Sequence, residues 1–187
     1  MSNSIFFKSN FKLNAANLIT CLNILSGMLA INFIFLENYT IAISFLWLAG
    51  LFDILDGKIA RKYNLSNEFG IQLDSYADFL SFVITPVFLI YSSIIIKMDG
   101  IYLILGGISL FVYLINGLFR LISFNIKSEE GEIEKYFTGI PTPLGAILLW
   151  LLYLSSSYEL IIEESIFIGL ILVVSFSMNS NIKIKHI

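Results

Sequence analysis

The most informative stretch of this chain reads DILDGKIAR at residues 53–61 and GIQLDSYAD at residues 70–78. It holds four aspartates within strongly apolar sequence: Asp53, Asp56, Asp74 and Asp78. The first pair is spaced i, i+3 and the second i, i+4, so each pair occupies one face of a helix. Carboxylates near a bilayer are costly and mark functional sites. We therefore predict two facing helices whose four carboxylates surround a shared space.

The composition indicates an integral membrane protein. Of the 187 residues, 57% are hydrophobic and 13% charged, and the mean hydropathy is +0.85. We predict an all-α fold of six transmembrane helices forming one domain, residues 1–187. The uncharged stretches that mark the spans are 13–36, 38–52, 79–96, 100–119, 136–158 and 165–182. The second approaches the required length of about 20 residues only if its helix continues through Asp53 to Arg61.

The basic residues predict the orientation. One side of the predicted topology collects ten lysines and arginines, and the other side only Lys97: the ten are Lys8, Lys12, Lys58, Arg61, Lys62, Arg120, Lys127, Lys135, Lys183 and Lys185. Positive residues concentrate in the cytoplasm, so both termini and the aspartates are predicted to face it from the cell membrane. The mixture of aromatics and lysines at residues 5–12 predicts a short interfacial helix before the first span.

The remaining composition excludes some functions. A net charge of −3 and a pI near 5.1 argue against a nucleic-acid partner. Cys21 is the only cysteine, so an intrachain disulfide is impossible, and we assign it to helix packing. His186, the only histidine, lies in a polar tail, and we assign it no catalytic role. The polar stretch 127–135 is interpreted as a solvated loop, with a lid or acceptor-gating role left open.

The aspartates predict a site for hard cations. Carboxylate oxygens suit Mg²⁺ or Mn²⁺, and Ca²⁺ fits the same ligands, whereas zinc does not. Four carboxylates are more than one Mg²⁺ usually takes from protein. They suit two divalent cations roughly 3.5–4 Å apart, the arrangement that clamps phosphates during a displacement reaction.

The residues around the aspartates favour phosphate chemistry. Gly57 and Gly70 remove side chains where a ligand would approach the helix backbone, and Ala60 extends the groove. Arg61 supplies a planar charged fork suited to phosphate. Each small residue alone is explained as well by helix packing in a membrane, but packing does not explain the set together with four aspartates.

The spacing of these residues resembles the signature of the CDP-alcohol phosphotransferases: Asp53-x2-Asp56-Gly57-x2-Ala60-Arg61-x8-Gly70-x3-Asp74-x3-Asp78. The resemblance implies transfer of a phosphatidyl-type group from a CDP-linked lipid to an alcohol, with release of CMP. It also implies two divalent cations and a homodimer.

The resemblance implies roles by position. The four aspartates resemble the family's metal ligands, and Asp78 also its general base. The CDP-lipid site is predicted from the following residues: Asn17, Thr20, Asp56, Gly57, Ala60, Arg61, Gly70 and Asp74. For Asn17 and Thr20, interhelical hydrogen bonds explain the polar side chains equally well.

The acceptor alcohol is predicted to be L-serine. Residues 17–27, 120–125 and 137–143 resemble segments of membrane-embedded phosphatidylserine synthases, although Ser123 stands where relatives often carry an arginine. Between the fourth and fifth predicted spans, the cytoplasmic side offers Arg120, Lys127 and Lys135 among four glutamates. These cations are adequate for a single carboxylate but too few for a phosphorylated acceptor. The predicted acceptor residues are Arg120 for the carboxylate, Asn125 for orientation, and Thr138 and Pro141 as walls. The alternative for Arg120 is a snorkelling residue at a helix end.

Three alternatives remain open. Within the family, the acceptor would be glycerol phosphate or inositol phosphate. A cation or proton transporter would also use intramembrane carboxylates, but this leaves Gly57, Ala60 and Gly70 unexplained. A non-catalytic membrane subunit predicts that Asp78→Asn is harmless.

Overall fold

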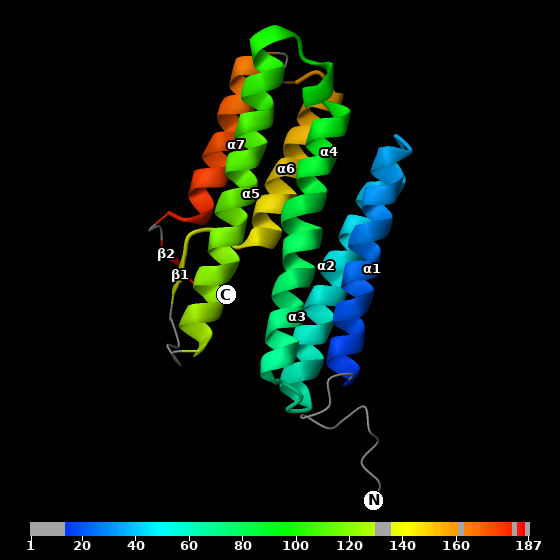
Figure 1. The fold of residues 1–187 in the computed structure, drawn as a ribbon, viewed down its shortest axis with the longest axis vertical. Helices are drawn as coiled ribbons and strands as arrows, with labels where there is room; N and C mark the ends of the chain where they lie inside the picture. The colour runs from blue at the N-terminus through cyan, green and yellow to red at the C-terminus, as the bar shows by residue number, and fades with distance from the viewer. Residues whose placement is uncertain (1–13, 130–135, 161–162, 181–182, 186–187) are drawn as a thin grey trace, which may run out of the picture. The chain divides into compact units, whose positions relative to one another are not determined.

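The computed structural model describes residues 14–129, 136–160, 163–180 and 183–185. The interfacial helix predicted at residues 5–12, most of the 127–135 loop and His186 lie outside the described residues. The chain divides into two units, Met1–Ser81 and Phe82–Ile187. The first holds α1 (Ala15–Phe35), α2 (Tyr39–Lys62) and α3 (Glu68–Asp78). The second holds α4 (Thr85–Ser93), α5 (Gly100–Glu129), α6 (Thr142–Ser157) and α7 (Glu164–Met178) (Figure 1).

Four helices among the described residues are long and apolar enough to cross a membrane, which confirms the predicted class. They are Ala15–Phe35, Tyr39–Lys62, Glu68–Lys97 and Gly100–Ile126. The third is continuous through α3, the π-helix η2 (Phe79–Ile84), α4 and the 3-10 helix η3 (Ile95–Lys97). The apolar helices Thr142–Ser157 and Glu164–Met178 are shorter, so the count of six spans stays a prediction.

In the first unit, α1 packs along α2 and also contacts α3 (Figure 1). The buried face of α2 consists of Ala42, Ala49 and Asp56, spaced seven residues apart. Two of these side chains are methyl groups, which let helices approach closely in a membrane. Phe33 of α1 stacks on Phe45 of α2, with ring centroids 5.5 Å apart. The same face of α2 that packs by alanines therefore continues into an aspartate.

Asparagines set the ends of the helices in the first unit. The side chains of Asn14, Asn38 and Asn67 accept hydrogen bonds from the first turns of α1, α2 and α3. Asn14 is fully buried, and its Nδ2 also donates to the carbonyl oxygen of Leu65, 3.0 Å away in the loop between α2 and α3. This one side chain therefore ties the start of α1 to the loop that turns α2 into α3.

In the second unit, α5 packs against α7, α6 contacts α7, and α4 contacts α5 and α6. Pro86 has no N–H with which to bond the carbonyl of Phe82, four residues earlier. The buried hydroxyl of Tyr113 in α5 donates to that carbonyl over 3.1 Å. A polar contact braces α5 against α7, because Asn116 Nδ2 donates to Ser175 Oγ over 2.9 Å.

The segment before α6 differs from the prediction. The uncharged stretch 136–158 marks a predicted span, but β1 (Tyr136–Thr138) pairs antiparallel with β2 (Lys183–Lys185), and α6 begins only at Thr142. Gly139 has a left-handed φ of 79°, which a helix does not accommodate. Pro141 then disfavours helical geometry in the residue before it. Hydropathy alone did not predict this interruption.

Candidate functional site

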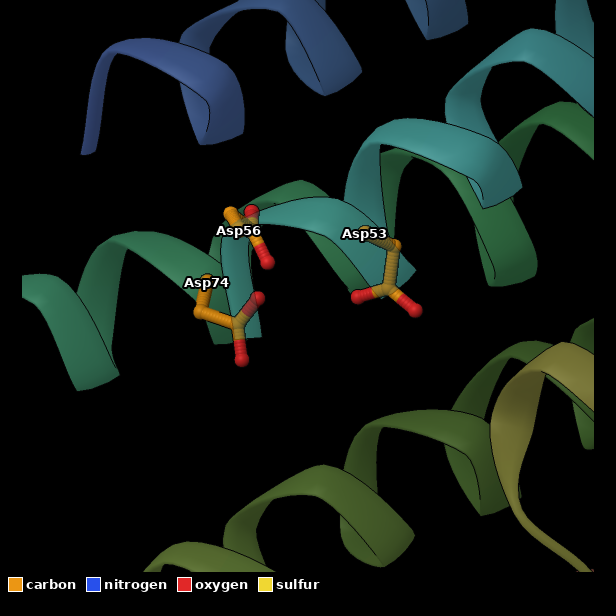
Figure 2. A group of neighbouring side chains, drawn as sticks. All are labelled: Asp53, Asp56 and Asp74. Atoms are coloured by element: carbon orange, nitrogen blue, oxygen red, sulfur yellow. The ribbon is translucent and has the colours of Figure 1, made fainter. Parts of the chain in front are cut away.

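Three of the four aspartates form a cluster in the first unit. Asp53 and Asp56 project from α2 and Asp74 from α3, and Figure 2 shows their carboxylates turned toward the same space. One carboxylate oxygen of each lies within 4.8 Å of the other two. The two stripes predicted from helical spacing are therefore brought together, as expected. Such a triad can hold a metal ion.

Asp78, one turn beyond Asp74, extends this cluster. Its side chain lies within hydrogen-bonding distance of the Asp53 carboxylate. Two carboxylates this close repel each other unless a proton or a cation lies between them. All four predicted ligands are therefore grouped on α2 and α3.

The cluster contains carboxylate oxygens that need a partner. Asp56 Oδ2, Asp74 Oδ1 and Asp78 Oδ1 are shielded from solvent, and none of them has a hydrogen-bond partner among the described residues. A buried polar atom without a partner costs roughly 1–3 kcal/mol, and more when it is charged. Divalent cations satisfy several carboxylate oxygens at once. The donor set, all oxygens and closely spaced, therefore fits the hard divalent cations that the sequence predicts.

A cavity of about 210 Å³ adjoins two of these aspartates. Its lining includes all eight residues predicted for the CDP-lipid: Asn17, Thr20, Asp56, Gly57, Ala60, Arg61, Gly70 and Asp74. The side chain of Thr20 on α1 lies within hydrogen-bonding reach of Asp56. Helices α1, α2 and α3 of the first unit thus line one cavity that holds two carboxylates and an arginine. This arrangement suits a ligand that carries phosphates bridged to cations.

The two glycines of the cavity meet different neighbours. A Cβ on Gly70 would lie 2.7 Å from Asn17 Oδ1, so a side chain at residue 70 would push the Asn17 amide out of its present position. A Cβ on Gly57 would lie 3.7 Å from the Arg61 guanidinium, which is an ordinary contact. Gly70 therefore leaves room for the Asn17 and Asn67 side chains, whereas Gly57 leaves space in the cavity itself.

Sequence reasoning missed several residues of this cavity. Leu65, Ser66 and Asn67 of the α2–α3 loop line it, together with Ala16 and Ile71. Leu65 is buried, and its carbonyl is held by Asn14 across 51 residues of sequence. The N-cap pattern of an asparagine three residues before Gly70 was readable in the sequence. The contact between Asn14 and Leu65 had no local signal.

The predicted acceptor residues belong to the second unit. Arg120 is buried on α5, only 8% exposed, and follows Asn116 by one turn; Asn125 is half-buried further along the same helix. Asn179, after α7, donates to the carbonyl and side-chain oxygens of Asn116. Pro141 is the N-cap of α6, and Thr138 ends β1. The hydrogen bonds that join Asn116 to Ser175 and Asn179 were not predicted.

Comparisons with known proteins give a consistent result. The sequence model of the family described as CDP-alcohol phosphatidyltransferase matches residues 13–177. The CDP-diacylglycerol–serine O-phosphatidyltransferase of Methanocaldococcus jannaschii is 35% identical over 83% of this chain and 68% of its own length. The protein of the same name from Bacillus subtilis is 33% identical over 90% of this chain and 88% of its own length. The archaetidylserine synthase of Methanothermobacter thermautotrophicus is 34% identical over 76% of this chain and 59% of its own length.

Proposed function

Because the chain belongs to the CDP-alcohol phosphatidyltransferase family, we propose that it transfers the phosphatidyl-type group of a CDP-lipid to the hydroxyl of L-serine, with release of CMP. The observation that carries this proposal is the cavity in the first unit. It is lined by every residue that the family resemblance assigns to the CDP-lipid, and its aspartate wall holds carboxylate oxygens without partners. The choice of L-serine as the acceptor alcohol is supported by the relatives named CDP-diacylglycerol–serine O-phosphatidyltransferase.

The CDP headgroup would occupy the cavity beside α1, α2 and α3. Arg61 would hold a phosphate, while Gly57 and Ala60 leave the α2 backbone open to the nucleotide. Asn17 and Thr20 would contact the nucleotide from α1. The lipid tails would remain in the bilayer, because the helices that form the cavity are membrane-spanning candidates. The lipid is diacylglycerol-based or an archaeal ether, since relatives of both names match the chain.

Asp53, Asp56, Asp74 and Asp78 would hold two divalent cations, Mg²⁺ or Mn²⁺, with Ca²⁺ compatible with the same oxygens. These cations would neutralise charge on the diphosphate and on the departing CMP. Asp78 would also accept the proton of the serine hydroxyl, which is a weak nucleophile until a positioned base removes it. A bond forms between the serine oxygen and the lipid-linked phosphorus, and the bond from that phosphorus to the CMP oxygen breaks.

Arg120 would bind the serine carboxylate, and Asn125 would orient the acceptor, with Thr138 and Pro141 as walls of its site. The burial of Arg120 favours this role, because a planar guanidinium removed from bulk water forms strong bidentate bonds to carboxylates.

At the level of the whole molecule, we propose one domain of six membrane spans in the cell membrane. Both termini and the aspartates would face the cytoplasm, as the distribution of basic residues predicts. The family resemblance adds a homodimer.

The proposal is tested by CMP release from purified protein supplied with CDP-diacylglycerol or CDP-archaeol, Mn²⁺ or Mg²⁺, and one alcohol at a time. We expect release with L-serine, and not with glycerol phosphate or inositol phosphate. Asp78→Asn should lower the rate about 10²–10⁴-fold. Asp99→Asn, on an exposed residue before α5, is the matched control and should leave the rate unchanged. Absence of serine-dependent CMP release with both lipids would contradict the proposal.

A further inference from the structure

Asn23 on α1 carries a buried amide that the roles described above do not use. Its residue is fully buried, and its Oδ1 accepts a hydrogen bond of 2.7 Å from Ser81 Oγ. Its Nδ2 is shielded from solvent and has no hydrogen-bond partner among the described residues. An unsatisfied buried donor costs about 1–3 kcal/mol, so this amide calls for a partner in the working protein.

The position of Asn23 points to Asp78 as that partner. Ser81, which holds the Asn23 side chain, follows Asp78 by three residues, within the π-helix η2. Asp78 Oδ1 is itself shielded from solvent and without a partner. The residue bonded to Ser81 thus has an unused donor, and the aspartate three residues before Ser81 has an unused acceptor, among the described residues.

Two contacts between α1 and the helix of Asp78 agree with this placement. Asn17 lies against Gly70, since a Cβ there would be 2.7 Å from Asn17 Oδ1, and Asn23 bonds to Ser81. The two contacts follow each other in the same order along α1 and along the helix of Asp78. Asp74 and Asp78 lie between Gly70 and Ser81 in the sequence, and therefore between the two contacts. Asn23 therefore closes the end of the aspartate cluster that is further from Gly70.

Gly27, one turn after Asn23, keeps the serine hydroxyl in place. A Cβ on Gly27 would lie 2.7 Å from Ser81 Oγ, so any larger residue would push the hydroxyl out of its present position. The bond between Ser81 and Asn23 thus depends on the absence of a side chain at position 27.

We propose that Asn23 is a positioning residue for Asp78. Its amide donates to the Asp78 carboxylate through one buried water, while Ser81 holds the amide. One carboxylate oxygen is thereby fixed, and the Asp78 side chain stays within hydrogen-bonding distance of Asp53. The inference rests on the proposed roles of Asp78 as cation ligand and proton acceptor. Partners of this kind typically change metal affinity or activity 10–100-fold.

The first test measures Mn²⁺ binding to purified protein in detergent without substrates, by electron paramagnetic resonance. Asn23→Leu keeps a similar volume and removes the donor, and it should weaken Mn²⁺ binding about 10–100-fold. In an Asp78→Asn background the same change should cause no further loss, because residues that act through one group are not additive. Ser26→Ala is the matched control, since that buried hydroxyl of α1 bonds only within its own helix, to the Leu22 carbonyl.

The second test separates positioning from binding of substrate. In Asn23→Leu, kcat for CMP release should fall about 10–100-fold, while the KM values for CDP-lipid and serine should stay within about threefold of wild type. Should Asn23→Leu fail to fold, Ser81→Ala gives the same test with a smaller loss of Mn²⁺ affinity, about three- to tenfold, because the donor remains but is less firmly held.

Three results would overturn the inference: unchanged Mn²⁺ affinity in Asn23→Leu and Ser81→Ala, an equal loss when Asn23→Leu is added to Asp78→Asn, or a wild-type protein that binds no Mn²⁺. The variants could show the expected changes in Mn²⁺ affinity although none of the alcohols tested causes CMP release. That result would support the positioning role of Asn23 and contradict the proposed function.

Discussion

Gly70 and Gly57 line the same cavity, but their substitution should have different consequences. A methyl group on Gly70 would meet Asn17 Oδ1 at 2.7 Å and Asn67 Oδ1 at 3.2 Å. Gly70→Ala therefore displaces a cavity wall and the cap of α3, and we expect lower thermal stability and a KM for CDP-lipid raised about tenfold, the equivalent of roughly 1.4 kcal/mol.

Gly57→Ala should instead keep or raise stability, by up to about 1 kcal/mol, because glycine is a poor helix former and the new methyl group makes only ordinary contacts. Any rise in KM then reflects a clash with the ligand. Thermal unfolding and KM, measured for both variants, separate the two cases. Gly107→Ala, which meets nothing within 4 Å, is the control. A destabilised Gly57→Ala with unchanged KM would contradict this interpretation.

Arg120→Lys tests the acceptor site. Lysine keeps the positive charge but loses the planar fork that binds a carboxylate bidentately. We expect the KM for serine to rise about tenfold and the KM for CDP-lipid to stay unchanged, because the loss of one charged hydrogen bond is worth about 1.5–3 kcal/mol. Steady-state kinetics with each substrate varied in turn check this. An equal rise in both KM values would indicate that Arg120 supports the fold and not the acceptor.

At this scale, the sequence predicted the grouping of residues that lie close together in the chain and act through their own side chains. The aspartates, glycines and Arg61 of the cavity fall within residues 53–78 at helical spacing, and the structure groups them as predicted. Asn14 and Leu65 escaped prediction because their contribution is a side chain bonded to a distant backbone carbonyl. The pairing of Asn23 with Ser81, 58 residues apart, escaped for the same reason.

At the scale of elements, the alanine face of α2 positions Asp56. Ala49 is fully buried and lies two turns before Asp56 on the same face. Ala49→Leu should force α2 away from its neighbours, destabilise the protein by about 1–3 kcal/mol and reduce CMP release. Ser44→Leu adds similar bulk on an exposed face of α2 and is the control. Thermal unfolding and CMP release measure both variants, and equal effects would show that the added bulk, not the helix contact, matters.

Tyr113→Phe tests how α5 supports the irregular helix around Pro86. The variant leaves the Phe82 carbonyl without the hydroxyl that now donates to it. A buried carbonyl that loses its partner should cost about 1–3 kcal/mol, visible as a lower unfolding temperature. Tyr102→Phe, on an exposed tyrosine of the same helix, should have no effect. An unchanged unfolding temperature in Tyr113→Phe would show that this contact is dispensable.

Hydropathy located the elements better than it located their ends. The helix of Asp53 continues to Lys62, as the length argument required. The helix of Asp74 runs from Glu68 to Lys97, whereas the uncharged stretch that marked this span covers only residues 79–96. A search for uncharged stretches stops at each aspartate, although the helix itself continues through it. The search therefore ends a span before the helix ends.

At the scale of the molecule, the number and direction of the spans follow from charge and length together. Glu68–Lys97 is long enough to cross a bilayer, so the loops at its two ends should lie on opposite sides. The end with Lys58, Arg61 and Lys62 is predicted to be cytoplasmic. The helices Thr142–Ser157 and Glu164–Met178 have only 16 and 15 residues, against the roughly 20 that a span requires, so the count of six depends on both of them.

Single cysteines test both points. Cys21 is the only native cysteine, so Cys21→Ser provides the background for Asn64→Cys, Asp99→Cys and Tyr158→Cys at exposed sites. We expect a membrane-impermeant maleimide to label Asp99→Cys in intact cells and Asn64→Cys only after lysis. Six spans require Tyr158→Cys, at the end of α6, to be labelled in intact cells as well. Protection of Tyr158→Cys together with labelling of Asp99→Cys would mean that α6 does not cross the membrane. Labelling of Asn64→Cys in intact cells would instead show the opposite orientation. The aspartate site would then lie on the side of the membrane away from cytoplasmic CDP-lipid and serine.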